Sequence, residues 1–491
     1  MILTKLLQEI PCTLEQGSME IEIRDVVNDS RKNVSGAIFV CQKGTTFDSH
    51  TLAASVAAAG AAAIVAEEGA EVDVPAGTTL IRVADTRRAY ALLCAAFFEY
   101  PTRRMCCIGV TGTKGKTTTT HMLRAIFEAA GDKTGLIGTN GITIGDRHIG
   151  TRNTTPDPYI LQQAFRQMAD EGCRHVIMEV SSQGLMMDRV AGVNFAIGVF
   201  TNLSPDHIGP NEHASFEDYA AAKSQLFRLC RTGFVNSDDE HCGLITAGHT
   251  CNLKTFGTAP GCDSRACNIR SERSGGFMGM VFDYIGRERY TIRVGIPGLF
   301  NVYNALGAIA VAERLGIPQE AVRKALANIK VDGRMEIVYS SDHCSVIVDY
   351  AHNGIAAESV LKMLRSYEPK RLVVVFGCGG NRDPHRRYEM GDAAGKYADL
   401  SIITADNSRD EDVMDIIRDI HIGFDPTGGK SVDIPDRREA IAYSIEHSQP
   451  GDVIAIIGKG HEDYQEEHGK RVHFLDREEA EIVLRRIGWM E

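Results

Sequence analysis

The sequence has little tryptophan, and its cysteines do not stand in any regular spacing. Its 491 residues include one tryptophan and thirteen cysteines, and no two cysteines stand in CxxC spacing. Cysteines crowd residues 230–267, but their irregular spacing does not match a zinc site. Neither a disulfide framework nor a zinc module is indicated. Scattered cysteines are typical of reduced thiols, so we expect a cytoplasmic protein.

The sequence also lacks an excess of basic residues and an apolar segment of membrane-spanning character. Lys and Arg number 53 against 65 Asp and Glu, and the net charge of −12 argues against nucleic acid as a main partner. The uncharged stretch 51–66 is mostly alanine and ends at Glu67, short of the roughly 20 residues that a bilayer span needs. Glu9 and Pro11 interrupt the first residues, which predict a short amphipathic helix rather than a signal peptide. We expect no membrane insertion.

Apolar strand-like runs alternate with helical patterns, which predicts an α/β fold with mostly parallel sheets. We predict three domains, residues 1–100, a central P-loop-type domain over 101–332, and a Rossmann-like α/β domain over 333–491. A helix is predicted at residues 52–60, and a loop or hairpin turn at residues 271–279. Strands are predicted at 61–68, 175–178, 196–200, 344–348, 371–376, 400–404 and 453–457. Functional side chains are then expected directly after the strands.

The most specific motif is GVTGTKGKTTTT, at Gly109–Thr120. It follows an apolar run at 105–110 and precedes a helical pattern with Met122, Leu123, Ile126, Phe127 and Ala130 on one face. A glycine-rich turn between a strand and a helix directs backbone N–H groups and the helix dipole at phosphate. Strict spacing would place glycine at Val110, so a chance match in a surface turn is the alternative. We predict a nucleoside triphosphate site made by Gly112, Thr113, Lys114, Gly115, Lys116, Thr117 and Thr118.

Polar side chains follow two further predicted strands. Glu179 ends the run at 175–178, and His207 lies in the loop after 196–200. Both are candidate metal ligands beside Thr117, whose hydroxyl group would bind Mg²⁺. The alternatives are that Glu179 caps a helix and that His207 is an ordinary loop histidine.

Nine short motifs follow one another along the chain: GVTGTKGKTTTT, NTTP, MEVSSQGL, TNLSPDHIG, GLFNVYNALGA, GRMEIV, VDYAHNG, FGCGGNRD and GKGHE. They occur in the order found in the Mur ligases, and the chain resembles this family from about residue 29 to residue 462. More narrowly, it resembles the branch that adds a diamino acid to UDP-MurNAc-L-Ala-D-Glu.

The resemblance implies an ATP-dependent ligase of peptidoglycan precursor synthesis. A peptide carboxylate attacks the γ-phosphate of ATP, and the incoming amine then attacks the acyl phosphate. Lys116 and Arg334 would supply positive charge to the phosphates. Two Mg²⁺ ions would be held by Thr117, Glu179, His207 and Lys223, the last as a carbamate. An ordinary surface lysine is the alternative for Lys223.

The resemblance also assigns the two nucleotide substrates. Asn301 and Asn304, three residues apart, would present amides to adenine, Asp349 would bind the ribose, and His352 would contact the nucleotide. Helix caps are the alternative for the asparagines. The first domain would bind the UDP precursor through Ser30. The central domain would complete that site with Thr154, Thr155, Ser181 and Arg189.

The third domain would bind the incoming amino acid, and the resemblance bears on which one. The diaminopimelate-adding type carries Asp-Asn-Pro-Arg, and here the block is Asp406-Asn407-Ser408-Arg409. Arginine suits a distal carboxylate, so meso-diaminopimelate is predicted. Arg387, Gly458 and Glu462 would contact the same substrate. L-Lysine is the alternative, because SSQ at 181–183 is typical of lysine-adding relatives.

Two other readings remain open at this point. A folylpolyglutamate-synthetase-like ligase shares the phosphate loop, and a non-ligase P-loop ATPase or regulatory nucleotide-binding protein needs only that loop. Neither accounts as well for the Asp406–Arg409 block or the GKGHE motif. We expect a monomer whose partners are the UDP precursor and a diamino acid.

Overall fold

The computed structural model describes residues 1–44, 47–206, 208–209 and 212–490. It forms two compact units, Met1–Ser264 with Gly307–Ala321, and Arg265–Leu306 with Val322–Glu491. Both contain parallel sheets with intervening helices, which confirms the predicted α/β class. The domain boundaries near residues 100 and 332 stay predictions. None of the helices in the described ranges is both long and apolar enough to cross a membrane.

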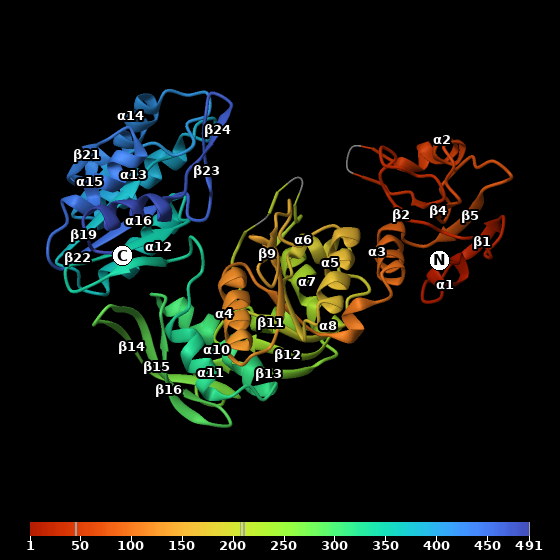
Figure 1. The fold of residues 1–491 in the computed structure, drawn as a ribbon, viewed down its shortest axis with the longest axis horizontal. Helices are drawn as coiled ribbons and strands as arrows, with labels where there is room; N and C mark the ends of the chain where they lie inside the picture. Colours follow the sequence, from red (N-terminus) through yellow and green to blue (C-terminus); the bar gives the residue numbers. More distant parts are fainter. Residues whose placement is uncertain (45–46, 207, 210–211, 491) are drawn as a thin grey trace. The chain divides into compact units, whose positions relative to one another are not determined.

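The first unit begins with a small mixed sheet in the order β1-β5-β4-β3-β2, drawn in red and orange in Figure 1. Only β1 runs antiparallel to its neighbour. The predicted helix at 52–60 and strand at 61–68 are confirmed as α2 and β4. The elements are α1 (Leu3–Leu6), β1 (Thr13–Gln16), β2 (Val26–Val27), β3 (Ile38–Val40), α2 (Ala53–Ala58), β4 (Ala63–Glu67), β5 (Thr79–Val83) and α3 (Thr86–Phe97).

The rest of the first unit is a larger sheet in the order β13-β12-β11-β6-β10-β7-β8-β9. Strands β7, β10, β6, β11, β12 and β13 are parallel, and β8 and β9 add antiparallel edges. The elements are β6 (Cys106–Thr111), α4 (Lys116–Ala129), β7 (Thr134–Gly138), β8 (Gly141–Ile144), β9 (Arg147–Ile149), α5 (Pro158–Asp170), β10 (His175–Glu179), α6 (Ser182–Met186), β11 (Phe195–Phe200), α7 (Phe216–Ser224), α8 (Leu226–Leu229), β12 (Cys230–Asn236), α9 (Cys242–Thr246) and β13 (Asn252–Gly257).

The second unit contains an antiparallel ribbon, β14-β15-β16, and a sheet in the order β17-β18-β22-β19-β20-β21. Apart from β17, the strands of that sheet are parallel. The elements of this part of the chain are β14 (Ser264–Ser274), β15 (Phe277–Ile285), β16 (Arg289–Val294), α10 (Leu299–Arg314), α11 (Gln319–Ala327), β17 (Glu336–Ser340), β18 (Cys344–Asp349), α12 (Gly354–Arg365), β19 (Arg371–Phe376), α13 (His385–Tyr397), β20 (Leu400–Ile403), α14 (Val413–Phe424), β21 (Ser431–Asp433), α15 (Arg437–Glu446), β22 (Asp452–Ile457), β23 (Tyr464–Glu467), β24 (Lys470–His473) and α16 (Asp476–Arg486). Residues 307–314 of α10 and 319–321 of α11 belong to the first unit.

The periodicity of α4 is confirmed. Met122, Leu123, Ile126 and Phe127 are all fully buried, whereas Ala130 lies just past the last helical residue. The helix that carries Lys223, α7, ends at Ser224, and α8 begins directly after Gln225. Most of residues 271–279 belong to strands β14 and β15, with only Gly275 and Gly276, both at positive φ, forming the hairpin turn.

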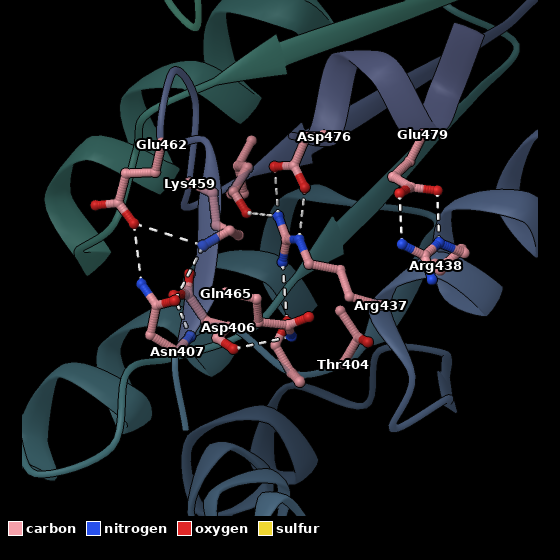
Figure 2. A network of polar contacts seen from close by, with 12 residues as sticks. Thr404, Asp406, Asn407, Arg437, Arg438, Lys459, Glu462, Gln465, Asp476 and Glu479 are labelled. Atoms are coloured by element: carbon pink, nitrogen blue, oxygen red, sulfur yellow. Dashed lines mark hydrogen bonds and ion pairs between the residues drawn. The ribbon is translucent and has the colours of Figure 1, made fainter. Parts of the chain in front are cut away.

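A buried ion pair connects the last two long helices of the second unit. Arg437 on α15 and Asp476 on α16 are both fully buried, and both nitrogens of the pair lie 2.7 Å from the carboxylate oxygens. The neighbouring pair Arg438–Glu479 is similar in geometry, but the arginine side chain is 60% exposed. Figure 2 shows the two pairs side by side. They therefore differ mainly in their exposure to water.

Asp476→Asn is expected to destabilise the second unit by about 3–5 kcal/mol, because it leaves the Arg437 charge buried without its partner. Glu479→Gln is the matched control and should cost about 0–1 kcal/mol, since the Arg438 guanidinium stays hydrated. Urea unfolding followed by Trp489 fluorescence measures the difference. Trp489 is the sole tryptophan and stacks on Tyr339 in this unit. Equal shifts of the midpoint in both variants would contradict the prediction.

Candidate active site

The predicted phosphate loop lies where three parallel strands end. Strand β6 is the middle strand between β10 and β11, and Glu179 and Phe200 pair with Val110 and Thr111, respectively. Val110 is therefore a buried strand residue, and the turn begins only at Gly112. The departure of Val110 from the strict motif spacing leaves the loop itself intact.

The turn requires glycine at its first position. Gly112 has a φ of 149°, and a Cβ there would lie 2.0 Å from the Thr201 Oγ1 atom. Gly115, with a φ of 85°, leads directly into α4. The chain thus makes a tight turn at the end of β6 and enters a helix whose N-terminal dipole favours an anion.

Lys116 and Thr117 occupy the first turn of α4. The Lys116 ammonium donates to the carbonyl groups of Gly112 and Thr113, at 2.8 and 3.0 Å, so the side chain folds back over the loop. The Thr117 hydroxyl donates to the Glu179 Oε1 atom at 3.0 Å. A cation and a hydroxyl–carboxylate pair therefore meet at the strand ends, as a phosphate and its counter-ion require.

Glu179 is 1% exposed, and its carboxylate is held from several sides. Besides Thr117, Oε1 accepts from the Thr139 backbone N–H at 2.9 Å, and Oε2 accepts from the Thr139 hydroxyl at 3.2 Å. A Cβ at Gly138 would lie 2.3 Å from Oε1, so the carboxylate fills the space that a side chain would need. The N-cap of α6 is Ser181, so Glu179 is not the cap of that helix.

Lys223 is also buried, with 1% exposure, and the alternative of a surface lysine is wrong. Its ammonium donates to the Gly112 carbonyl at 3.0 Å and lies 4.5 Å from the centre of the Tyr219 ring. Burial lowers the pKa of Lys223 well below its usual value, and the nearby Lys116 charge lowers it further. His207, the remaining predicted metal ligand, lies outside the described residues.

The donor atoms decide which metal could bind here. Among the described residues, no three His, Cys, Asp or Glu side chains cluster closely enough to hold a metal by themselves. A cation would therefore depend on mixed oxygen donors, the Thr117 hydroxyl, the Glu179 carboxylate and phosphate oxygens. Mg²⁺ is bound in this way, by one or two carboxylates together with substrate phosphates. The residues present fit that ion.

Most of the residues predicted to bind the UDP precursor form one hydrogen-bonded group next to Glu179. The Thr155 hydroxyl donates to the Glu179 carbonyl at 3.0 Å and accepts from the Ser181 N–H at 2.9 Å. The Arg189 guanidinium donates to the Thr155 carbonyl at 3.0 Å. The Thr154 and Thr139 hydroxyl oxygens are 3.1 Å apart.

Ser30 stands apart from this group. It occupies an exposed turn between Asp29 and Arg31, whose side chains form an ion pair of 2.8 Å. Among the hydrogen bonds of the described residues, none connects Ser30 to Thr154, Thr155, Ser181 or Arg189. Its assignment to the precursor depends on the family resemblance alone.

The predicted adenine contacts lie on one face of α10, in the segment of that helix that belongs to the second unit. Asn301 and Asn304 are 1% and 3% exposed. Asn304 donates from Nδ2 to the Asn301 Oδ1 atom at 2.9 Å, and Asn301 donates to the Pro297 carbonyl at 2.7 Å. The two amides share a face, as their spacing predicts, and they are bonded to each other.

Arg334, Asp349 and His352 lie together in the second unit. Asp349 ends β18, and its oxygens accept from the N–H groups of Met335 and Ala351 at 2.7 and 2.9 Å. Burial raises the pKa of the Asp349 carboxyl, opposed by these bonds and by the Arg334 charge. The Arg334 guanidinium lies 4.6 Å from the centre of the Tyr350 ring. The centre of the His352 ring lies 4.7 Å from the centre of the same tyrosine ring.

Two loops that we call the acceptor segments, Asp406–Arg409 and Gly458–Glu462, follow strands β20 and β22. The Asn407 Nδ2 atom donates to the Glu462 Oε2 atom at 2.9 Å, as Figure 2 shows. Gly458 has a φ of 117°, and a Cβ there would lie 2.9 Å from the Asp406 Oδ2 atom. The structure therefore brings together the residues predicted to bind the added amino acid.

The two predicted arginines differ in their partners. Arg387 is 3% exposed and bonds Glu411 and Asp419, at 2.8 and 2.7 Å, so its charge is already compensated. Arg409 donates to the Gly380 carbonyl at 2.6 Å and has no ion pair with any described residue. Of these two arginines, Arg409, the last residue of the first acceptor segment, is thus the one whose charge is not compensated by a described carboxylate.

Sequence reasoning missed two buried cations in the same region. Lys459, inside the GKGHE motif and the second acceptor segment, is fully buried and bonds Asn407 of the first segment. Arg437 donates to the carbonyl groups of Ala405 and Ile457, at 3.2 and 3.1 Å, just before each segment begins. The glycines flanking Lys459 were the available signal, because they permit the tight backbone that turns this lysine inward.

The comparisons with known proteins agree with this geometry. The chain matches the Mur ligase middle domain over residues 110–312 and the Mur ligase glutamate ligase domain over residues 333–460. It is 42% identical to the UDP-N-acetylmuramoyl-L-alanyl-D-glutamate–2,6-diaminopimelate ligase of Geobacillus kaustophilus, covering 94% of each chain. It is 40% identical to the ligase of the same name from Caldanaerobacter subterraneus, covering 96% of each.

A solved structure of a ligase with that name superimposes with a TM-score of 0.73 at 30% identity, covering 95% of each chain. The fold and the phosphate loop define a nucleotide-dependent α/β enzyme. The chain belongs to the Mur ligase family, whose members are ATP-dependent and use Mg²⁺. The reading as a non-ligase ATPase is thereby set aside.

Proposed function

We propose that the chain joins the amino group of 2,6-diaminopimelate to the D-Glu carboxylate of UDP-MurNAc-L-Ala-D-Glu, at the expense of ATP. The names of its near-full-length relatives support this activity. The observation that carries it is the acceptor region itself. Asn407 and Glu462 are hydrogen-bonded, and Arg409 beside them has a charge with no ion-pair partner among the described residues. A diamino acid with a distal zwitterion requires such opposite charges.

Phosphoryl transfer needs positioning and charge neutralisation more than a dedicated nucleophile. Lys116, which bonds the loop carbonyls in the free chain, would exchange them for phosphate oxygens of ATP. Arg334 would add a second positive charge, and Asp349 would accept from the ribose. Thr117 and Glu179 would hold Mg²⁺, which when bound neutralises charge that develops on the phosphates. The D-Glu carboxylate attacks the γ-phosphorus, ADP leaves, and an acyl phosphate results.

The second half of the reaction consumes the acyl phosphate. The neutral amine of the acceptor attacks the acyl carbon, inorganic phosphate leaves with the bonding pair, and the amine loses a proton as the amide forms. Glu462 would bind the distal ammonium of diaminopimelate, and Arg409 its distal carboxylate, which arginine can grip with two parallel hydrogen bonds. Asp406 and Gly458 would shape the same pocket.

Lys223 would act as a carbamate. Carbamylation needs a neutral amine, whose nitrogen attacks the carbon of CO₂ and releases one proton. The lowered pKa of the buried Lys223 supplies that neutral form. The product would offer an anionic oxygen to a second Mg²⁺, which Glu179 and His207 would also hold. Carbamylation would also remove the repulsion between the Lys223 and Lys116 charges.

The test of the proposed function is phosphate release from ATP in the presence of UDP-MurNAc-L-Ala-D-Glu, with meso-diaminopimelate or L-lysine as acceptor. Release that depends on diaminopimelate is expected. Release that depends on L-lysine instead would keep the ligase and overturn the acceptor, and Ser408, which replaces the proline of the diaminopimelate-type block, would then be examined first. Release with neither acceptor would overturn the proposed function.

A further inference from the structure

Lys459 is a fully buried lysine of the second acceptor segment, and its ammonium group bonds Asn407 of the first. The flanking residues Gly458 and Gly460 have φ values of 117° and 54°, and residues other than glycine rarely adopt positive φ values. A Cβ at Gly460 would also lie 2.7 Å from the Tyr350 Cβ atom. The two glycines therefore allow the tight turn that directs the lysine side chain inward instead of toward water.

The ammonium group of Lys459 makes two hydrogen bonds and one ion pair. It donates to the Tyr464 carbonyl at 2.6 Å and to the Asn407 Oδ1 atom at 3.1 Å. Its nitrogen also lies 3.5 Å from the Glu462 Oε2 atom, an ion pair inside a single turn. Figure 2 shows dashed lines from the ammonium to both the Asn407 and the Glu462 side chains. Lys459 thus touches both residues whose orientation matters for the added amino acid.

These contacts decide which way the Asn407 amide faces. Its Oδ1 atom accepts from Lys459 and also from the Glu466 backbone N–H at 3.0 Å. The opposite orientation would set the amide N–H₂ against both donors and the amide oxygen against a carboxylate. Only the orientation with Nδ2 toward Glu462, at 2.9 Å, satisfies all of these groups.

We infer that Lys459 is a positioning residue for the acceptor amino acid: it fixes the Asn407 amide and, through it, the Glu462 carboxylate. The inference depends on the proposed function, because Glu462 is assigned to the distal ammonium of that substrate. The lysine itself is too deeply buried to touch a ligand. Its effect should therefore reach the acceptor alone and leave binding of ATP and of the UDP precursor unchanged.

Lys459→Met tests this inference, since methionine has a similar volume and removes only the ammonium. The KM for meso-diaminopimelate is expected to rise by about 10- to 100-fold. The KM values for ATP and for the UDP precursor should stay within about twofold. The matched control is Lys430→Met, which removes an exposed lysine of the same unit and should change none of the three. A role in folding alone would lower the active fraction without moving one KM selectively.

A double-mutant cycle with Asn407→Ala identifies the route of the effect. If Lys459 acts through Asn407, the change in KM caused by Lys459→Met should largely disappear in the Asn407→Ala background. Additive effects of the two substitutions would overturn the inference, as would an unchanged KM for diaminopimelate in Lys459→Met.

Lys459→Gln covers the case in which the methionine variant does not fold, because glutamine keeps a donor for the Tyr464 carbonyl. It should fold and still raise the KM for diaminopimelate selectively. Failure of both variants to fold would overturn the inference and make Lys459 a residue required for folding. Assays of the unchanged chain separate the two hypotheses. If it releases no phosphate in response to an acceptor, the proposed function is wrong. If it releases phosphate normally and Lys459→Met does so with the same KM values, only the inference about Lys459 is wrong.

Discussion

Replacing Arg409 with methionine is expected to lower kcat/KM for meso-diaminopimelate by about 100- to 1,000-fold, while any activity with L-lysine is not reduced. L-Lysine has no distal carboxylate, so it gains nothing from the guanidinium. Arg409 is suited to this role because, within the described part of the chain, its guanidinium bonds only the Gly380 carbonyl and forms no ion pair. Its charge is therefore available to a substrate carboxylate.

Arg409→Lys should lower kcat/KM for meso-diaminopimelate nearly as much as Arg409→Met, because a lysine ammonium cannot make two parallel hydrogen bonds with a carboxylate. Arg438→Met is the control, since that arginine pairs with Glu479 at the exposed side of α15. The measurement is steady-state phosphate release over a range of each acceptor. An equal loss with both acceptors would mean that Arg409 only holds its loop. The left-handed backbone of Arg409, with a φ of 52°, and its bridge to Glu467 give that outcome a physical basis.

The strands that carry the site could be predicted from sequence because each is a short apolar run ending in polar residues. The run at 175–178 became β10 with one added residue, Glu179, and the run at 344–348 became β18 with Asp349 added. In both cases the added residue is the functional candidate. Parallel strands place such residues at one edge of the sheet, so local sequence and topology agree there.

The partners of the buried cations could not be predicted in this way. Lys459 bonds Asn407 across 52 residues of sequence, and Arg437 bonds Asp476 across 39. No periodicity connects such positions. For the same reason the sequence could not show that the Arg387 guanidinium is bonded to Glu411 and Asp419, and it left the burial of Lys223 open. Which charges are already compensated is a property of the fold.

Lys223→Ala is expected to lower kcat by about 1,000-fold, the loss typical of removing one preorganised electrostatic group from an active site. The reason is the position of the side chain. The Lys223 nitrogen lies 3.0 Å from the Gly112 carbonyl, at the start of the phosphate loop, and almost no part of the side chain reaches water. A cation confined beside Lys116 would raise the local positive charge, whereas a carbamate would offset it and offer oxygen to Mg²⁺.

Carbon-13 NMR of the unchanged chain in labelled bicarbonate should therefore show a carbamate signal that Lys223→Ala lacks. Lys133→Ala is the control, since Lys133 pairs with Glu171 at the surface. Two results would contradict the proposal in different ways. Full activity in Lys223→Ala would remove the side chain from the mechanism. An inactive variant combined with no carbamate signal in the unchanged chain would mean that Lys223 acts as an amine. The lowered pKa of Lys223 would then favour a neutral amine that forms hydrogen bonds beside the phosphate loop.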